Sequence, residues 1–213
     1  MTKVTSTQVL LYYPNLIGYA RILFMIGSFY FALSNWKLTL IFYLLAFGGD
    51  VVDGYVARAF KQSSKYGGVL DMVTDRVSTC GFLFLLSHLY PQWSFIFVSL
   101  VSLDIFSHWF HVSSVTGHHK SGETLAHRNF ILRAYYAVPF LFGYCCIGAE
   151  LFYVLLYTHH FFPHPIIYNL CWYGCLPGCA IKQVINVAQL ASACDAIAAI
   201  DAEEANSNST KKK

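Results

Sequence analysis

Long apolar stretches alternate with short polar segments along most of the chain. Six stretches are long enough for a membrane-spanning helix, which needs about 20 mostly apolar residues. They cover residues 12–33, 37–59, 67–90, 93–114, 130–157 and 166–195. The polar breaks between consecutive stretches include segments 34–37, 90–93 and 158–165. This pattern predicts an all-α fold, a polytopic membrane bundle of six transmembrane helices.

Composition supports a membrane location. Hydrophobic residues make up 56% of the 213 residues, and charged residues only 12%, compared with roughly 25% charged residues in a typical soluble domain. The net charge of +3 is small and does not indicate a nucleic-acid partner. We expect one membrane domain over residues 1–200. The polar, small-residue segment 201–213 is typical of a disordered tail.

The distribution of basic residues predicts the orientation. Six spans place both termini on the same side of the membrane. The segments on that side carry nearly all the lysines and arginines between spans: Lys3, Arg58, Lys61, Lys65, Lys120, Arg128 and Lys211–Lys213. The opposite loops contain only Lys37. By the positive-inside rule, both termini and the loop around Lys61 face the cytosol.

Four aspartates stand out in this apolar sequence. Asp50 and Asp53 are three residues apart, and Asp71 and Asp75 are four apart, so each pair lies on one face of its helix. Small residues share these faces: Gly54, Ala57, Gly67 and Ser78. The short basic loop between the helices predicts antiparallel neighbours. We therefore expect the two acidic faces to meet near the cytosolic surface.

The charge of such a site requires compensation. Two like charges at about 4 Å repel by roughly 4 kcal/mol at an effective dielectric near 20, and Arg58 alone cannot neutralise four carboxylates. Mg²⁺ or Mn²⁺ prefers oxygen ligands, and paired metals held by carboxylates assist displacement at phosphorus. A structural ion-pair cluster is the alternative. Acids within membrane spans are costly and usually functional, which favours a metal site.

The spacing of these residues also carries a resemblance. The pattern reads Asp50-x2-Asp53-Gly54-x2-Ala57-Arg58-x8-Gly67-x3-Asp71-x3-Asp75. It resembles the complete motif of the CDP-alcohol phosphatidyltransferase family. The resemblance implies a six-helix integral membrane enzyme, typically a homodimer. Such an enzyme transfers a phosphate-linked group from a CDP-activated donor to an alcohol and releases CMP.

Further segments narrow the resemblance within the family. Residues 14–22, 70–79, 102–114 and 150–157 are similar to members that use CDP-diacylglycerol as donor and myo-inositol as acceptor. These members imply phosphatidylinositol as the product and the endoplasmic reticulum membrane as the location. The similarity covers most of the chain and is weakest in residues 118–129 and in the sixth span.

The resemblance also implies roles for individual residues. Asp50, Asp53 and Asp71 would hold Mg²⁺ or Mn²⁺, two ions in all, and Asp75 would contact one of them. Asp75 would also be catalytic, accepting the proton of the attacking hydroxyl. CDP-diacylglycerol would be bound by Gly54, Arg58, Ser64 and Asn15.

The acceptor pocket is predicted from polar residues in the fourth and neighbouring spans. Four of them recur at three- and four-residue spacing and share a helix face: Asp104, Ser107, His108 and His111. This face either binds a polyol or forms hydrogen bonds between helices. Arg76 and Arg133 either shape the same pocket or extend to the membrane interface. The predicted pocket comprises Asp104, His108, Arg76 and Arg133.

Two alternatives remain at this level. Another family enzyme would use glycerol 3-phosphate or serine as acceptor. A phosphorylated acceptor calls for an additional basic cluster, so the few basic residues here favour a neutral polyol. A divalent-cation channel or transporter is the alternative from a different class. It would place acids near the bilayer midplane, whereas these acids cluster beside a basic loop.

Overall fold

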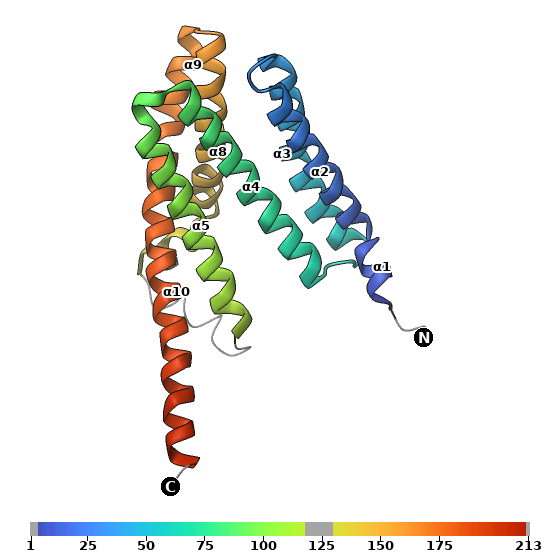
Figure 1. Cartoon of the computed structure of the whole chain (residues 1–213), viewed down its shortest axis with the longest axis vertical. Coiled ribbons are helices and arrows are strands. Elements are labelled where there is room, and N and C mark those ends of the chain that lie inside the picture. Colours follow the sequence, from blue (N-terminus) through green and yellow to red (C-terminus); the bar gives the residue numbers. More distant parts are fainter. Residues whose placement is uncertain (1–3, 118–129, 212–213) are drawn as a thin grey trace. The chain divides into compact units, whose positions relative to one another are not determined.

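The chain is helical throughout the part that the structure describes. A computed structural model describes residues 4–117 and 130–211, and every regular element in these ranges is a helix (Figure 1). The helices form two compact units, Met1–Leu89 and Tyr90–Lys213. The all-α class predicted from the sequence is confirmed.

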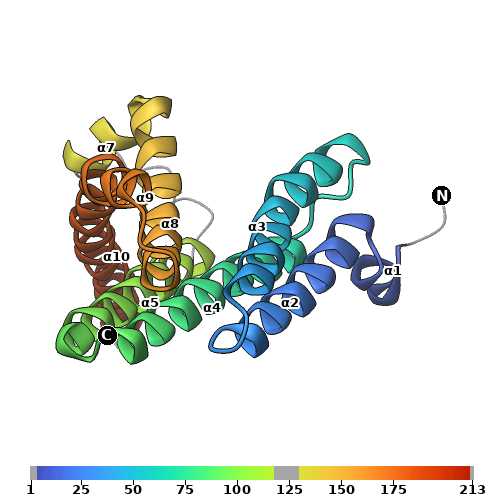
Figure 2. The ribbon, with the colours of Figure 1, turned by 90° about the horizontal axis from the view of Figure 1, so that it is seen from above.

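The described residues of unit 1 form four helices. They are α1 (Ser6–Leu10), α2 (Tyr13–Phe31), α3 (Trp36–Ala59) and α4 (Lys65–Leu89). Helix α2 runs side by side with α3 and also packs against α4 (Figures 1 and 2). Because α2 contacts both partners, it can place a side chain between the two aspartate-bearing helices.

The helix starts in unit 1 follow from local sequence. Thr5 and Gln8 form a capping box at the start of α1, and Pro14 lies in the first turn of α2, where a missing N–H costs no hydrogen bond. The side chain of Asn35 accepts a hydrogen bond from the amide of Leu38 and caps α3. These signals explain why the predicted and observed starts agree to within a few residues.

The loop between α3 and α4 has a defined geometry. The amide of Gln62 donates to the carbonyl of Ala57, and the amide of Lys61 donates to that of Arg58. With Lys61 at φ 54°, in the left-handed region, this is a Schellman ending of α3. The side chain of Gln62 then accepts a hydrogen bond from the amide of Tyr13 at 2.9 Å. The loop is thereby fixed to the start of α2.

Unit 2 contains the remaining helices. They are the 3₁₀ turn η1 (Pro91–Trp93), α5 (Ser94–Gly117), α7 (Phe130–Ala137), α8 (Pro139–Phe161), α9 (Pro165–Asn169), the π-helical segment η2 (Leu170–Cys175) and α10 (Leu176–Lys211). Helix α10 packs along both α5 and α8 (Figure 2). Tyr135, Cys145 and Ile185 lie at the centre of a buried cluster in this unit.

Four stretches are long and apolar enough to cross a membrane, among the residues that the structure describes. They are Trp36–Ala59, Pro91–Ser114, Pro139–Phe161 and Pro165–Asn208. The first and second predicted spans correspond to α2 and α3, and the third to α4. Helices α2 and α4 are interrupted by charge, at Arg21 in α2 and at Asp71, Asp75 and Arg76 in α4, so they do not qualify by composition alone.

Two sequence predictions differ from the structure. The span predicted over 130–157 is broken between α7 and α8, because Pro139 forces Val138 into an extended conformation (φ −115°, ψ 93°). The segment expected to be a disordered tail instead continues α10 as far as Lys211. Alanine and glutamate are good helix formers, and extending an existing helix requires no new nucleus. The boundary of a single domain at residue 200 stays a prediction.

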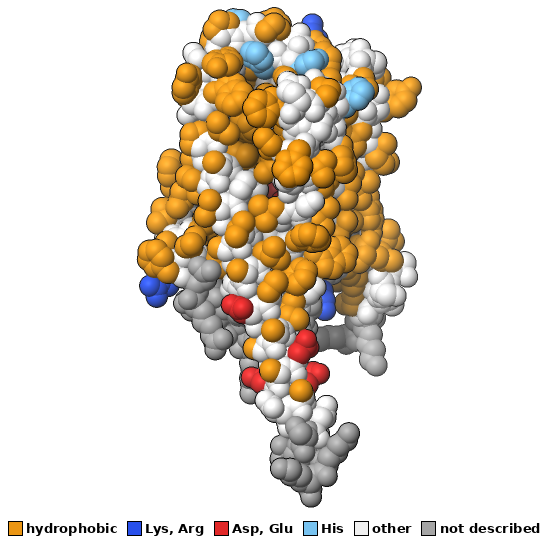
Figure 3. Space-filling view, turned by 60° about the vertical axis from the view of Figure 1, so that its left-hand side comes forward, with side chains coloured by type: hydrophobic (Ala, Val, Ile, Leu, Met, Phe, Trp, Pro, Cys, Tyr) orange, Lys and Arg blue, Asp and Glu red, His pale blue; other side chains and the backbone are white. Residues whose placement is uncertain are grey.

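The surface is consistent with a membrane environment. Large apolar side chains are open to the surroundings, for example Phe95 at 84% and Phe140 at 83% exposure. One face of the molecule is covered mainly by hydrophobic side chains, while acidic side chains gather toward the C-terminal end of α10 (Figure 3). Extended apolar surface of this kind requires lipid or another apolar partner.

Candidate active site in unit 1

The four aspartates of the motif converge on one point. Each carboxylate contacts the guanidinium group of Arg21, at 2.9 Å for Asp50, 2.7 Å for Asp53, 2.7 Å for Asp71 and 2.6 Å for Asp75. Asp50 and Asp53 come from α3, Asp71 and Asp75 from α4, and Arg21 from α2. The two acidic faces therefore meet, but an arginine from a third helix lies between them.

Sequence reasoning missed Arg21. Its side chain is only 3% exposed, and it lies in a stretch that was assigned simply as an apolar span. The available signal was the charge itself, because an ionisable residue within a membrane span is costly and usually functional. Arg21, rather than Arg58, is the cation that contacts all four aspartates.

The carboxylate oxygens of these aspartates form a possible site for a divalent cation. One carboxylate oxygen from each of Asp50, Asp53 and Asp71 lies within 4.8 Å of the others. Four formal negative charges, set against the guanidinium groups of Arg21 and of Arg76, which lies 3.8 Å from Asp75, leave an excess of two negative charges at the cluster. An all-oxygen donor set with this excess of negative charge fits a hard divalent cation such as Mg²⁺ or Mn²⁺.

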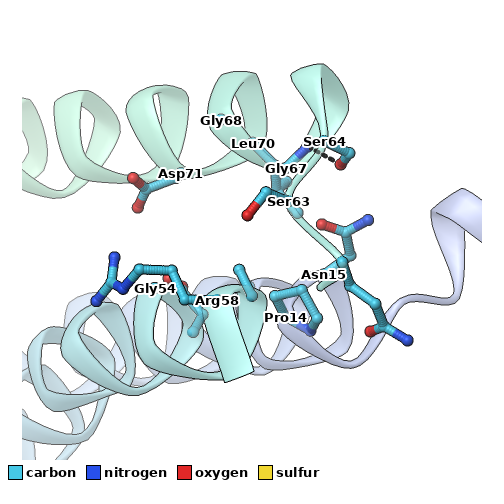
Figure 4. Close-up of a pocket in the computed structure, with 14 residues that line it drawn as sticks. Pro14, Asn15, Gly54, Arg58, Ser63, Ser64, Gly67, Gly68, Leu70 and Asp71 are labelled. Atoms are coloured by element: carbon cyan, nitrogen blue, oxygen red, sulfur yellow. Dashed lines mark hydrogen bonds between the residues drawn. The ribbon is translucent and has the colours of Figure 1, made fainter. Parts of the chain in front are cut away.

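A cavity of about 210 Å³ opens beside the cluster. Asp53 and Asp71 line it together with all four residues that the sequence assigned to the donor: Asn15, Gly54, Arg58 and Ser64. Figure 4 shows Asp71 on α4 and Arg58 on α3 pointing into the same space. The structure thus brings acidic and basic groups of the motif to the wall of one cavity.

The far end of the cavity is formed by Asn15, Ser64 and Gly67. Ser64 caps α4 by accepting a hydrogen bond from the amide of Gly67 at 3.0 Å (Figure 4). Asn15 is 1% exposed, and its Nδ2 donates to the carbonyl of Val9 at 2.6 Å. A Cβ on Gly67 would lie 2.9 Å from Asn15 Oδ1. Glycine therefore permits the close contact between α4 and α2 here.

Gly54 and Arg58 lie one helical turn apart on α3. A Cβ on Gly54 would lie 3.6 Å from Nη1 of Arg58, so the guanidinium group folds back over the glycine. This position leaves a forked donor at the cavity wall. A guanidinium suits the oxygens of a phosphate group, which it can contact with two parallel hydrogen bonds.

The predicted acceptor residues are divided between the two units. Arg76 belongs to unit 1, where Nη2 lies 3.8 Å from Oδ2 of Asp75. Asp104 and His108 belong to α5 in unit 2, and His108 Nδ1 lies 2.8 Å from the Asp104 carbonyl oxygen. Arg133 is exposed on α7, also in unit 2. A shared acceptor pocket stays a prediction.

Comparison with known proteins identifies the class of protein. The sequence model of the family described as CDP-alcohol phosphatidyltransferase matches residues 11–162, more than half of the chain. The chain belongs to this family. The match includes the whole aspartate motif, and it favours an enzyme over a cation channel.

Curated relatives have a narrower name. The human CDP-diacylglycerol–inositol 3-phosphatidyltransferase is 41% identical over 92% of this chain and 96% of its own length. The Drosophila melanogaster protein of the same name is 37% identical, over 96% of this chain and 92% of its own length. A probable CDP-diacylglycerol–inositol 3-phosphatidyltransferase 2 from Arabidopsis thaliana is 36% identical over 95% of this chain and 96% of its own length. No solved structure matches the chain.

Proposed function

We propose that this protein transfers the phosphatidyl group of CDP-diacylglycerol to myo-inositol, forming phosphatidylinositol and CMP. The relatives that bear the corresponding enzyme name cover nearly the whole chain. The observation that carries the proposal is the convergence of all four motif aspartates beside a cavity lined by Arg58. This arrangement suits displacement at a phosphate that carries a nucleotide.

The donor would occupy the cavity between α3 and the start of α4. Arg58 would bind a phosphate of CDP-diacylglycerol, because its guanidinium lies at the cavity wall. Gly54 would let the nucleotide approach the backbone of α3, and Ser64 and Asn15 would contact the nucleotide at the other end. Binding there places the pyrophosphate next to Asp53 and Asp71, which line the same cavity.

Asp50, Asp53 and Asp71 would hold two Mg²⁺ or Mn²⁺ ions, with Asp75 contacting one of them. When bound, such ions offset the negative charge that develops on the pyrophosphate as CMP leaves. Asp75 would accept the proton of an inositol hydroxyl. A bond then forms between that hydroxyl oxygen and the lipid-linked phosphorus, and the bond from this phosphorus to the CMP oxygen breaks.

The acceptor pocket, the orientation, the location and the oligomeric state are further parts of the proposal. We expect inositol to be bound by Asp104, His108, Arg76 and Arg133. The basic residues around the 58–65 loop support an active site on the cytosolic face, with both termini on that side. We also expect the enzyme to reside in the endoplasmic reticulum membrane, as a homodimer.

The reaction can be tested in membranes that contain the protein. CDP-diacylglycerol, Mn²⁺ or Mg²⁺ and labelled myo-inositol should give labelled lipid together with an equal amount of CMP. Parallel reactions with labelled serine and glycerol 3-phosphate test the alternative acceptors, and we expect neither to be used. Preferential labelling from serine or glycerol 3-phosphate would contradict the acceptor assignment. Lipid labelling that persists in excess chelator would contradict the role of the metals.

A further inference from the structure

All three guanidinium nitrogens of Arg21 make polar contacts. Nη1 donates to Asp53 and Asp71, Nη2 donates to Asp75 and pairs with Asp50, and Nε donates to the carbonyl of Ala46 at 3.2 Å. Both terminal nitrogens thus serve one acid from each of the two helices. This single side chain links the two aspartate pairs.

The backbone of α3 is shaped around the arginine. A Cβ on Gly49 would lie 2.6 Å from Cγ and 3.1 Å from Cδ of Arg21, so only glycine leaves room for the stem at this depth. The neighbouring Gly48 has nothing within 4 Å of an added Cβ, among the residues that the structure describes. The position of Arg21 therefore depends on Gly49 and not on Gly48.

The guanidinium uses the carboxylates that the proposed metal site requires. Asp50, Asp53 and Asp71 each direct an oxygen to Arg21, and the same three residues form the cluster with oxygens close enough for a shared cation. A guanidinium and a divalent cation cannot occupy one position, and their charges repel. Arg21 and the metals therefore compete for these three carboxylates.

We propose that Arg21 is a built-in counter-ion that holds the four aspartates together before the metals bind and lowers the protein's affinity for them. This inference rests on the proposed metal site. The hydrogen bond to Ala46 and the space above Gly49 hold the stem, so the guanidinium can yield the carboxylates while it stays beside them. Arg21 is in this sense a positioning residue, and metal loading is an exchange of cations.

The test is a Mn²⁺ titration of the purified full-length protein in detergent, with free Mn²⁺ measured by electron paramagnetic resonance. Arg21→Gln is expected to lower the Mn²⁺ dissociation constant at least tenfold and to lower the unfolding temperature in chelator. Lys65→Gln is the control, because it removes an exposed cation of the same unit. Mn²⁺ binding by Arg21→Gln that equals or is weaker than that of the unchanged protein would overturn the proposal.

A second pair of variants keeps all charges. Gly49→Ala should displace the Arg21 stem and tighten Mn²⁺ binding, whereas Gly48→Ala should bind Mn²⁺ as the unchanged protein does. Equal affinities for Gly49→Ala and Gly48→Ala would contradict the proposal even if Arg21→Gln fails to fold. If Arg21 had only a structural role, its substitution would lower the unfolding temperature without strengthening Mn²⁺ binding.

The outcomes separate this inference from the proposed function. Equal Mn²⁺ affinities across all variants, with inositol transfer intact in the unchanged protein, would contradict the counter-ion alone. Failure of the unchanged protein to bind Mn²⁺ at all would contradict the metal site, and the counter-ion with it.

Discussion

The two units arrange their buried polar groups differently: unit 1 gathers ion pairs at one point, whereas unit 2 buries Asp104 on α5 and joins neutral groups between two other helices. Unit 1 buries charge, with Arg21 at 3% exposure among four carboxylates. Unit 2 joins neutral groups between α8 and α10: Cys179 Sγ contacts the Tyr153 hydroxyl, and Gln183 Nε2 donates to the same hydroxyl at 3.5 Å. Asn186 in turn donates to Gln183 at 3.3 Å.

The charged cluster and the neutral contacts between α8 and α10 differ in what they cost the protein. Charges in an apolar setting are costly, so a cluster of them is retained where a reaction needs it. Neutral hydroxyl, amide and thiol groups can link helices at a much lower cost, and each contributes about 0.6 kcal/mol in membranes. We therefore expect substitutions of unit 1 acids to abolish turnover and substitutions of the neutral groups between α8 and α10 to change mainly stability.

The largest contrast should come from comparing acids of the two units. Asp71→Asn removes a proposed metal ligand and should lower the rate of inositol transfer roughly 10³-fold, the scale of a lost electrostatic contact in a transition state. Asp195→Asn, at an exposed acid on α10, should leave the rate unchanged. The rates are measured in proteoliposomes with equal protein content. An equal loss of activity in both variants would contradict the comparison.

A smaller effect is expected at the cavity wall. Arg58→Gln removes the proposed phosphate contact and should raise the KM for CDP-diacylglycerol roughly 10- to 100-fold, the scale of a hydrogen bond to a charged group. Arg58→Lys keeps the charge but not the fork, and should restore only part of the affinity. An unchanged KM for the donor in Arg58→Gln would remove this residue from the donor site.

The shape of the cavity gives a finer test with a matched control. Gly67→Ala adds a methyl group 2.9 Å from Asn15 Oδ1 and 3.2 Å from Ser64 Oγ. The added strain of about 1 kcal/mol should raise the donor KM about fivefold. Gly68→Ala meets nothing within 4 Å in the described structure and should leave KM unchanged. Equal KM values for the two variants would show that this end of the cavity does not contact the donor.

The smallest effect on activity should come from the Tyr153 contact between α8 and α10 in unit 2. Tyr153→Phe removes the hydroxyl that Cys179 and Gln183 share. We expect a loss of about 0.6–1 kcal/mol of stability and a rate of inositol transfer within about twofold of the unchanged protein. Thermal unfolding and transfer assays on the same sample measure both. A large loss of turnover with unchanged stability would show that the Tyr153 contact between α8 and α10 also takes part in the reaction.

Local spacing predicted much of the site but not what lies at its centre. Asp50, Asp53, Asp71 and Asp75 follow from helical periodicity, because residues three and four apart share a face. Arg21 reaches these acids from another helix, some 50 residues earlier than Asp71, and no local period encodes such a contact. For this contact, the charge of Arg21 within an apolar stretch was the signal that sequence reasoning left unused.

The differences in the fold have another cause, because they depend on local signals. The spans were found because apolar runs of sufficient length are a direct consequence of bilayer thickness. The break at Val138 depends on Pro139, a local signal that was overlooked. The continuation of α10 depends on helix propensity, which polar composition obscured. The acceptor residues belong to two units: spacing grouped Asp104 with His108, and Arg76 and Arg133 were added because they lie near the cytosolic ends of their spans.

The most direct test of the central claim is inositol transfer by Asp75→Asn. Asparagine is nearly the same size as aspartate but cannot accept the proton, so the account predicts a loss of roughly 10²- to 10⁴-fold in the rate, with binding of CDP-diacylglycerol retained. The measurement compares labelled phosphatidylinositol formed by the variant and by the unchanged protein at saturating donor. Labelling by Asp75→Asn at the rate of the unchanged protein would contradict the proposed reaction at this site.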